Sequence, residues 1–260
     1  MAGQVLTTIE NGIGSLIFDH EARRNAITGE MWDAIPAAVI AFEKSNEVRV
    51  VVMRGAGEVA FVSGADISEF EKNRSGASAA AYDQSNQRAF ATLAGMQKPL
   101  IAMIHGFCIG GGCALALTAD LRYCAEDGVF SIPAAKLGLG YHAGGLEALV
   151  SVVGQSVARE IFFTARRFDA TEALRMGLVN AVLPKEQLEA HVAEVAQQIA
   201  DNAPLTLASA KFILSQIQRE PGARDQAAID ASIGACYESA DYAEGVRAFL
   251  EKRSPKFKGR

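Results

Sequence analysis

Residues 108–124, CIGGGCALALTADLRYC, decide the fold. Three consecutive glycines continue a strand or a helix poorly, because each glycine loses extra backbone entropy on folding. The small, mostly apolar residues after them predict a buried helix. The run before them, KPLIAMIHG at residues 98–106, predicts a buried strand that ends at the triplet. Such a junction presents unblocked backbone N–H groups, and these groups attract negative charge.

A second loop of the same kind is VSGADI, residues 62–67, which follows a β-branched run that predicts another buried strand. Gly64 permits a tight turn there, and Asp66 is suited to cap a short helix. If both loops face one cavity, the N–H groups of Ala65 and Gly111 can hold one developing oxyanion.

The rest of the chain supplies further strands and helices. Apolar and polar residues alternate on both sides of an Asn-Gly pair, which predicts an antiparallel hairpin over residues 4–19. Residues 28–45 predict a helix with Thr28 as its N-cap, and an alanine-rich helix is expected over residues 77–96.

Strand, strand and helix repeat in the first part of the chain, whereas the last third is mostly helical. This order predicts an α/β protein. We expect a core over residues 1–200 and a helical C-terminal region over residues 201–260.

Composition narrows the function classes. The 260 residues carry a net charge of −5, and no nucleic-acid partner is expected because such a partner needs a basic face. No apolar run is long enough to predict a membrane helix. The four cysteines and four histidines lack the spacing of metal ligands, so we expect no metal. Reduced thiols and the lack of a signal peptide predict a cytoplasmic location.

Several motifs occur together and in order: RRNAIT, FVSGADISEF, KPLIAMIHGFCIGGGCALALTADLRYCAED, FSIPAAKLGLGY and FTARRFDATEALRMGLVNAVLP. With the ending AFLEKRSPKF, they resemble the crotonase family, the enoyl-CoA hydratase/isomerase superfamily. The resemblance runs from about residue 4 to the end of the chain.

This resemblance implies a crotonase-like spiral of ββα units with a C-terminal helical region for trimerisation, assembled as a homotrimer or a dimer of trimers. The ligand would be an acyl-CoA thioester in fatty acid metabolism. Its carbonyl oxygen would lie between the N–H groups of Ala65 and Gly111, which would stabilise a thioester enolate. No separate cofactor is implied, since coenzyme A is part of the substrate. The residues implied for CoA binding are Arg24, Ala26, Ser63, Ala65, Asp66, Ile67 and, from a neighbouring subunit, Phe249 and Lys252.

The chain departs from the family at the acid/base positions. Hydratases of this family carry two glutamates that position water and move its proton, and this chain has Ala114 and Ala134 in the two places. An alanine side chain performs no acid/base chemistry. Tyr141 and His142 follow in the segment that borders the acyl pocket in relatives, and they are the candidates to replace the glutamates.

Three functions therefore stay open. The family indicates a lyase of enoyl-CoA hydratase type. The segment around Tyr141 also resembles the methylmalonyl-CoA decarboxylase branch, although that branch has a histidine in place of Ala65. The third alternative is a non-catalytic protein that binds acyl-CoA.

Overall fold

The computed structural model describes residues 2–66 and 77–260. The described strands are β1 (Gln4–Glu10), β2 (Ile13–Asp19), β3 (Val50–Gly55), β4 (Ala60–Val62), β5 (Leu100–Ile104), β6 (Phe107–Ile109), β7 (Leu121–Ala125), β8 (Val129–Ser131), β9 (Phe168–Asp169) and β10 (Ala181–Leu183). The described helices are η1 (Glu21–Arg23), α1 (Gly29–Lys44), α3 (Ala77–Ala94), α4 (Gly111–Leu117), α5 (Ala134–Leu137), α6 (Ala143–Thr164), α7 (Ala170–Arg175), α8 (Lys185–Ala200), α9 (Pro204–Ile217), η3 (Pro221–Ala223), α10 (Gln226–Tyr237) and α11 (Ala240–Glu251).

The predicted N-terminal hairpin is confirmed. β1 and β2 pair antiparallel along their whole length, from Gln4 opposite Asp19 to Glu10 opposite Ile13. Asn11 and Gly12 both have positive φ angles, 51° and 83°, as a type I′ turn requires. The predicted helix cap is confirmed as well, because the hydroxyl of Thr28 accepts a hydrogen bond from the N–H of Met31 at the start of α1.

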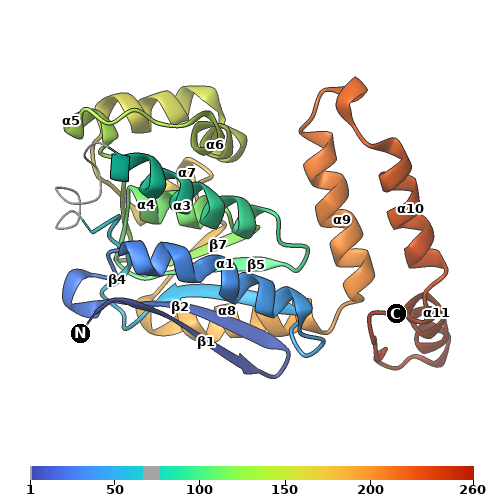
Figure 1. Cartoon of the computed structure of the whole chain (residues 1–260). Coiled ribbons are helices and arrows are strands. Elements are labelled where there is room, and N and C mark those ends of the chain that lie inside the picture. The colour runs from blue at the N-terminus through green and yellow to red at the C-terminus, as the bar shows by residue number, and fades with distance from the viewer. Residues whose placement is uncertain (1, 67–76) are drawn as a thin grey trace.

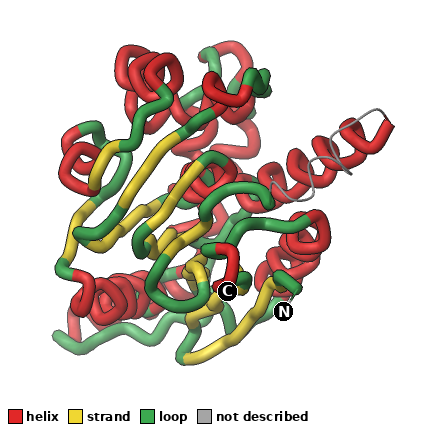
Figure 2. The backbone as a smooth tube through the Cα atoms, turned by 90° about the vertical axis from the view of Figure 1, so that its left-hand side faces the viewer, coloured by secondary structure: helices red, strands yellow, loops and turns green. Residues whose placement is uncertain are grey.

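A six-stranded sheet in the order β1-β2-β3-β5-β7-β10 forms the centre of the molecule, and every pair after the hairpin is parallel. Alternate side chains of β3 face opposite ways: Val51 and Met53 join the main core, while Val50 and Val52 pack with α8. α1 covers β1 and β2 from the other side. Figure 2 shows the strands lying between layers of helices.

A second sheet was not predicted. It has the order β4-β6-β8-β9, with β4, β6 and β8 parallel and β9 antiparallel. The strand expected over residues 98–106 ends at Ile104, and the glycine triplet follows β6 instead. The chain changes sheets at Gly106, whose φ is 49° and where a Cβ would overlap the carbonyl oxygen of Val59. Successive units thus place one strand in each sheet.

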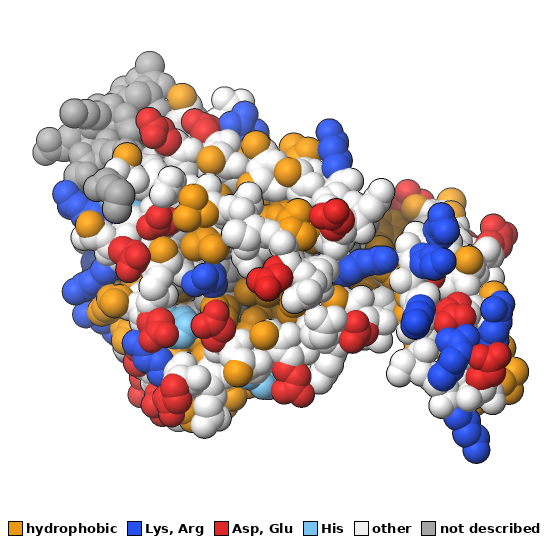
Figure 3. All heavy atoms as spheres, turned by 90° about the horizontal axis from the view of Figure 1, so that it is seen from below, with side chains coloured by type: hydrophobic (Ala, Val, Ile, Leu, Met, Phe, Trp, Pro, Cys, Tyr) orange, Lys and Arg blue, Asp and Glu red, His pale blue; other side chains and the backbone are white. Residues whose placement is uncertain are grey.

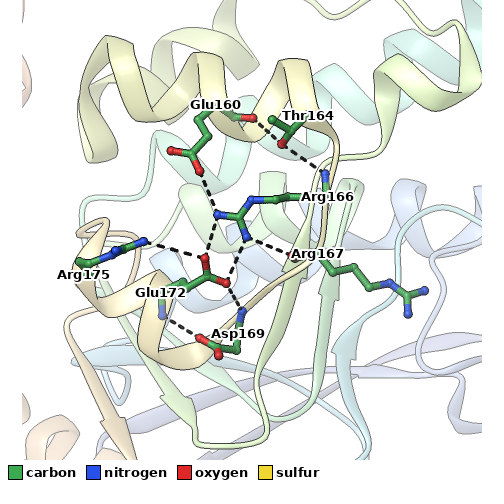
Figure 4. A network of polar contacts seen from close by, with 7 residues as sticks. All are labelled: Glu160, Thr164, Arg166, Arg167, Asp169, Glu172 and Arg175. Carbon is green, nitrogen blue, oxygen red and sulfur yellow. Dashed lines mark hydrogen bonds and ion pairs between the residues drawn. The ribbon is translucent and has the colours of Figure 1, made fainter.

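An ion-pair network joins the end of α6 to α7 (Figure 4). The guanidinium of Arg166 contacts Glu160 at 2.9 Å and Glu172 at 2.8 Å. Asp169 and Glu172 form a capping box at the start of α7. The hydrogen bond from Arg166 holds the pKa of Glu172 below its usual value. Because these groups reach solvent, the network orients β9 and α7 more than it stabilises the fold.

Helices α9, α10 and α11 stand apart from the two sheets (Figure 1). Seen from below, they form a lobe on which acidic and basic side chains alternate (Figure 3). Lys211 ties α9 to the core through Asp120 at 2.7 Å and the carbonyl oxygen of Lys98 at 2.9 Å. The domain boundary predicted after residue 200 falls between α8 and α9.

Candidate active site

Ala65 and Gly111 lie side by side because the strands before them are paired. Val62 of β4 and Cys108 of β6 are register partners in a parallel ladder. Ala65 and Gly111 each follow three residues later, so equal spacing brings them to the same place in successive units of the fold. A Cβ built on Gly111 would lie 3.7 Å from the backbone nitrogen of Ala65.

The backbone N–H of Ala65 points away from the neighbouring segment. Ile27 donates to the carbonyl oxygen of Gly64 at 2.9 Å and accepts from the N–H of Asp66 at 2.9 Å. In this parallel bridge the N–H of Ala65 lies between these two hydrogen bonds and points away from Ile27. Among residues 2–66 and 77–260, no acceptor pairs with the N–H of Ala65 or with that of Gly111, the first residue of α4.

Two such donors suit one oxygen. The two loop backbones approach closely, since the nitrogen of Ala65 lies 3.7 Å from the position of a Cβ on Gly111. One oxygen can accept from two N–H groups at about 2.9 Å each when both point into the same space. Ala65 and Gly111 are both half-buried, so the space in front of them opens to solvent.

The three glycines of the triplet serve different purposes. Gly110 has φ 54° and ψ −112°, a conformation that side chains disfavour. A Cβ on Gly112 would overlap the carbonyl oxygen of Val62. Gly111 is different, since its nearest neighbours would be 3.6 to 3.8 Å from a Cβ, an ordinary contact distance. The protein's own packing therefore requires Gly110 and Gly112, whereas Gly111 keeps open the space beside Ala65.

Asn25 anchors the segment that the sequence assigns to CoA, and sequence reasoning missed it. Its side chain is 1% exposed and donates to the carbonyl oxygens of Ala56 at 3.0 Å and Ala60 at 2.8 Å, while it accepts from the N–H of His20. Its φ is 55°. Asparagine tolerates this left-handed conformation, so its place in RRNAIT was the available signal.

Hydrogen bonds join this segment to the loop that carries Ala65. The hydroxyl of Ser63 donates to the carbonyl oxygen of Arg23 at 3.0 Å. The backbone N–H of Ser63 donates to the carbonyl oxygen of Arg24 at 3.1 Å. The guanidinium of Arg24 lies 4.4 Å over the ring of Phe107. The structure thus brings five predicted CoA-binding positions together: Arg24, Ala26, Ser63, Ala65 and Asp66. Ile67 lies outside the described residues.

The positions of the missing glutamates differ in exposure. Ala114 is half-buried on α4, one turn after Gly111, and Ala134 is 4% exposed at the start of α5. Among the described residues, no group of three or more His, Cys, Asp or Glu side chains is suited to hold a metal ion. None of the described helices is both long enough and apolar enough to cross a membrane.

The two acid/base candidates have different surroundings. Tyr141 is half-buried and packs edge-on against Phe162, with ring centroids 4.9 Å apart. The side chain of His142 is 68% exposed at the start of α6, 3.3 Å from the amide of Gln87 and 4.0 Å from Asp83. Tyr141 therefore packs against the edge of the core, whereas His142 lies on the surface.

Phe249 and Lys252 do not meet the other site residues within one chain. Both lie at the end of α11 in the C-terminal lobe, away from the two sheets (Figure 1). The side chain of Phe249 is 84% exposed.

Trp32 lies next to Gly111, a neighbour that the sequence did not predict. It belongs to α1, is 1% exposed, and its ring carbons Cζ2 and Cη2 would lie 3.6 and 3.8 Å from a Cβ on Gly111. The sequence predicted only a helix over residues 28–45, because the packing of α1 against Gly111 is a tertiary contact.

Comparison with known proteins decides the family. The profile of the family described as enoyl-CoA hydratase/isomerase matches residues 8–260, nearly the whole chain. The chain belongs to the enoyl-CoA hydratase/isomerase family. The predicted crotonase membership is thereby confirmed, and the match includes both loops.

Individual members of the enoyl-CoA hydratase/isomerase family are similar to this chain over nearly its whole length. A crotonyl-CoA hydratase of Syntrophomonas wolfei is 32% identical over 95% of this chain and 95% of its own length. A carnitinyl-CoA dehydratase of Salmonella typhi is 34% identical over 92% of each chain. The crystal structure of an enoyl-CoA hydratase/carnithine racemase from Magnetospirillum magneticum superposes with a TM-score of 0.92, at 33% identity over 98% of this chain and 96% of that one. The predicted crotonase-like α/β fold is thus confirmed.

Proposed function

We propose that this protein is a lyase of enoyl-CoA hydratase type that acts on an acyl-CoA thioester. The observation that carries the proposal is the pair of N–H groups at Ala65 and Gly111, set side by side by the pairing of β4 with β6. Relatives named crotonyl-CoA hydratase and carnitinyl-CoA dehydratase support the same reaction class.

The chemistry assigned to this pair is stabilisation of an enolate. When the oxygen of water bonds to the β-carbon of an enoyl thioester, the electrons of the double bond move to the carbonyl oxygen. Hydrogen bonds from Ala65 and Gly111 then become stronger than in the ground state, which lowers the barrier. A proton from an acid restores the α-carbon, and a base takes one from the water.

The acid and base are the open part of the mechanism, since neither Ala114 nor Ala134 can serve. Of the two candidates, we favour Tyr141, because a half-buried phenol is better placed to exclude bulk water than the exposed ring of His142. Glu147 is exposed near the start of α6 and is a further residue to test.

Decarboxylation of a branched malonyl-CoA is the second candidate. It needs an enolate site but no pair of water-activating carboxylates, and both usual positions are alanine here. A third outcome, acyl-CoA binding without turnover, would make the protein a binding module.

Assembly and CoA binding follow the same proposal. CoA would lie along the Arg24 segment and the Ser63 loop, and Phe249 and Lys252 of a neighbouring subunit would reach its nucleotide end. The C-terminal lobe carries an apolar groove of about 660 Å³ lined in part by Tyr237, Tyr242 and Phe249. We propose that copies of the chain bury this groove against one another when they assemble into a homotrimer or a dimer of trimers. A cytoplasmic location and a role in fatty acid metabolism remain predictions from the sequence.

The test is hydration of crotonyl-CoA, followed by loss of the enoyl absorbance. Turnover at enzyme-like rates supports the hydratase assignment, and Tyr141, His142 and Glu147 are then substituted in turn. Release of carbon dioxide from malonyl-type esters without hydration supports the decarboxylase. Gly111→Pro removes one N–H and adds ring carbons at a helix position where proline is tolerated, so turnover should fall by at least about 100- to 1,000-fold. Unchanged turnover in that variant contradicts the proposed oxyanion site.

A further inference from the structure

Trp32 borders the space in front of Ala65 and Gly111. A Cβ built on Gly111 would lie 3.7 Å from the nitrogen of Ala65 and 3.6 Å from Cζ2 of the indole. The amide and the ring therefore approach the same small volume from two directions. The ring itself is 1% exposed and its position is set by packing.

Two residues of α3 hold the indole in place. Its Nε1–H donates to the hydroxyl of Tyr82 at 3.2 Å, and the ring of Phe90 packs edge-to-face at a centroid distance of 5.2 Å. Tyr82 is itself 6% exposed. The orientation is thus fixed by a hydrogen bond and an aromatic contact, and the benzene side of the indole, with Cζ2 and Cη2, is the part that points at Gly111.

We infer that Trp32 is a substrate-contacting residue, whose ring edge forms a third side of the thioester-oxygen site and is positioned there by Tyr82. The inference rests on the proposed function. The edge of an aromatic ring carries partial positive charge, so ring C–H groups directed at a developing oxyanion stabilise it. The same edge excludes water, which strengthens the hydrogen bonds from Ala65 and Gly111.

This assignment makes Trp32 a built-in reporter, because it is the only tryptophan in the chain. Its fluorescence should respond in a saturable way to butyryl-CoA, a saturated thioester that cannot be hydrated. Free coenzyme A, which lacks the acyl group and its carbonyl oxygen, should change the emission much less at the same occupancy. Calorimetry on the same samples measures the occupancy independently.

Two variants and a control separate a substrate contact from a structural role. Trp32→Phe shortens the ring edge and should lower kcat about three- to tenfold with KM little changed. Tyr82→Phe keeps the α3 ring but removes the acceptor of the indole N–H, so it should shift the emission of Trp32 and lower kcat in the same direction. Ser85→Ala, which breaks only the 2.7 Å bond to Asp33 between α1 and α3, should leave both unchanged.

The outcomes distinguish this inference from the proposed function. If calorimetry detects no acyl-CoA binding to the native protein, the proposed function fails and the role of Trp32 falls with it. If butyryl-CoA binds but leaves the fluorescence of Trp32 unchanged, or changes it no more than free coenzyme A does, the proposed function stands and the inference is overturned. Equal kcat values for Trp32→Phe and the native enzyme overturn it as well. Should Trp32→Phe fold poorly, the emission and kcat of Tyr82→Phe decide alone.

Discussion

Adding one methyl group at each of two adjacent glycines should have opposite consequences. At Gly111 the new carbon would have neighbours at 3.6 to 3.8 Å, so Gly111→Ala should fold normally. Its stability should change by less than about 1 kcal/mol, since alanine favours the helix. At Gly112 the same carbon overlaps the carbonyl of Val62, and neither backbone can yield cheaply.

Gly111→Ala should keep its stability but lose catalytic activity, whereas Gly112→Ala should mainly lose stability. A methyl carbon 3.7 Å from the nitrogen of Ala65 intrudes on the space of an oxygen held about 2.9 Å from both donors. Gly111→Ala keeps both N–H groups but should crowd this oxygen and lower kcat/KM by at least about tenfold, equivalent to about 1.4 kcal/mol. Gly112→Ala should lose about 2–3 kcal/mol of stability and lower Tm by about 4–12 °C.

Thermal melts and kinetics on both variants check the reasoning, with the reaction identified in the crotonyl-CoA assay. The stability of Gly111→Ala must match the native protein, so that any loss of turnover reflects the site. Native-like kcat/KM in Gly111→Ala would refute the placement of the oxyanion. A drop in its Tm as large as that of Gly112→Ala would refute the steric distinction between the glycines.

Three further predictions concern stability and reactivity. Burial lowers the pKa of His105, so on acidification below about pH 6.5 the unfolded chain takes up a proton before the folded chain does. The free energy of unfolding should therefore be highest above that pH and fall below it. His105→Asn should flatten this slope, measured in urea melts at pH 7.5 and 5.5. Asn25→Ala leaves the buried carbonyl of Ala60, the part-buried carbonyl of Ala56 and the N–H of His20 without their partner, and should cost about 2–4 kcal/mol in urea unfolding; a loss below about 1 kcal/mol would mean that water replaces the amide. At most one thiol, that of half-buried Cys236, should react with Ellman's reagent in the native protein, against four in denaturant, because the other three are buried and burial raises the pKa of Cys108 and brings that of Cys124 to about 12. Cys236 lines the groove that the proposed assembly buries, so it should react fully only in a dissociated chain, and a second fast equivalent would contradict the prediction.

Local patterns predicted the elements whose causes are local. The Asn-Gly turn and the Thr28 cap depend on neighbouring residues, and both form as expected. The short strands β4, β6 and β9 were missed because two or three residues show no periodicity, and only pairing across the second sheet makes them strands.

The candidate site divides in the same way. Glycine chemistry predicted an open backbone at Gly111 and in the loop of Ala65, and the resemblance implied that both donors face one thioester oxygen. Trp32 and Asn25 depend on contacts with segments far along the chain, at Gly111 and Ala60, which no pattern within their own segments indicates. The contacts of His142 with Gln87 and Asp83 of α3 likewise join segments far apart in the sequence.

The pairing of β4 with β6 has a consequence for how the protein would lose activity on heating. The separation of Ala65 and Gly111 is maintained by main-chain hydrogen bonds of the small sheet, and these are independent of the C-terminal helices. Partial unfolding that releases α9 to α11 would leave the donor spacing intact, whereas opening of the small sheet would destroy it. Protection of the β4 and β6 amides against hydrogen exchange should therefore track how long the proposed donor pair survives storage or heating, whereas overall helix content should track the proposed assembly and CoA binding.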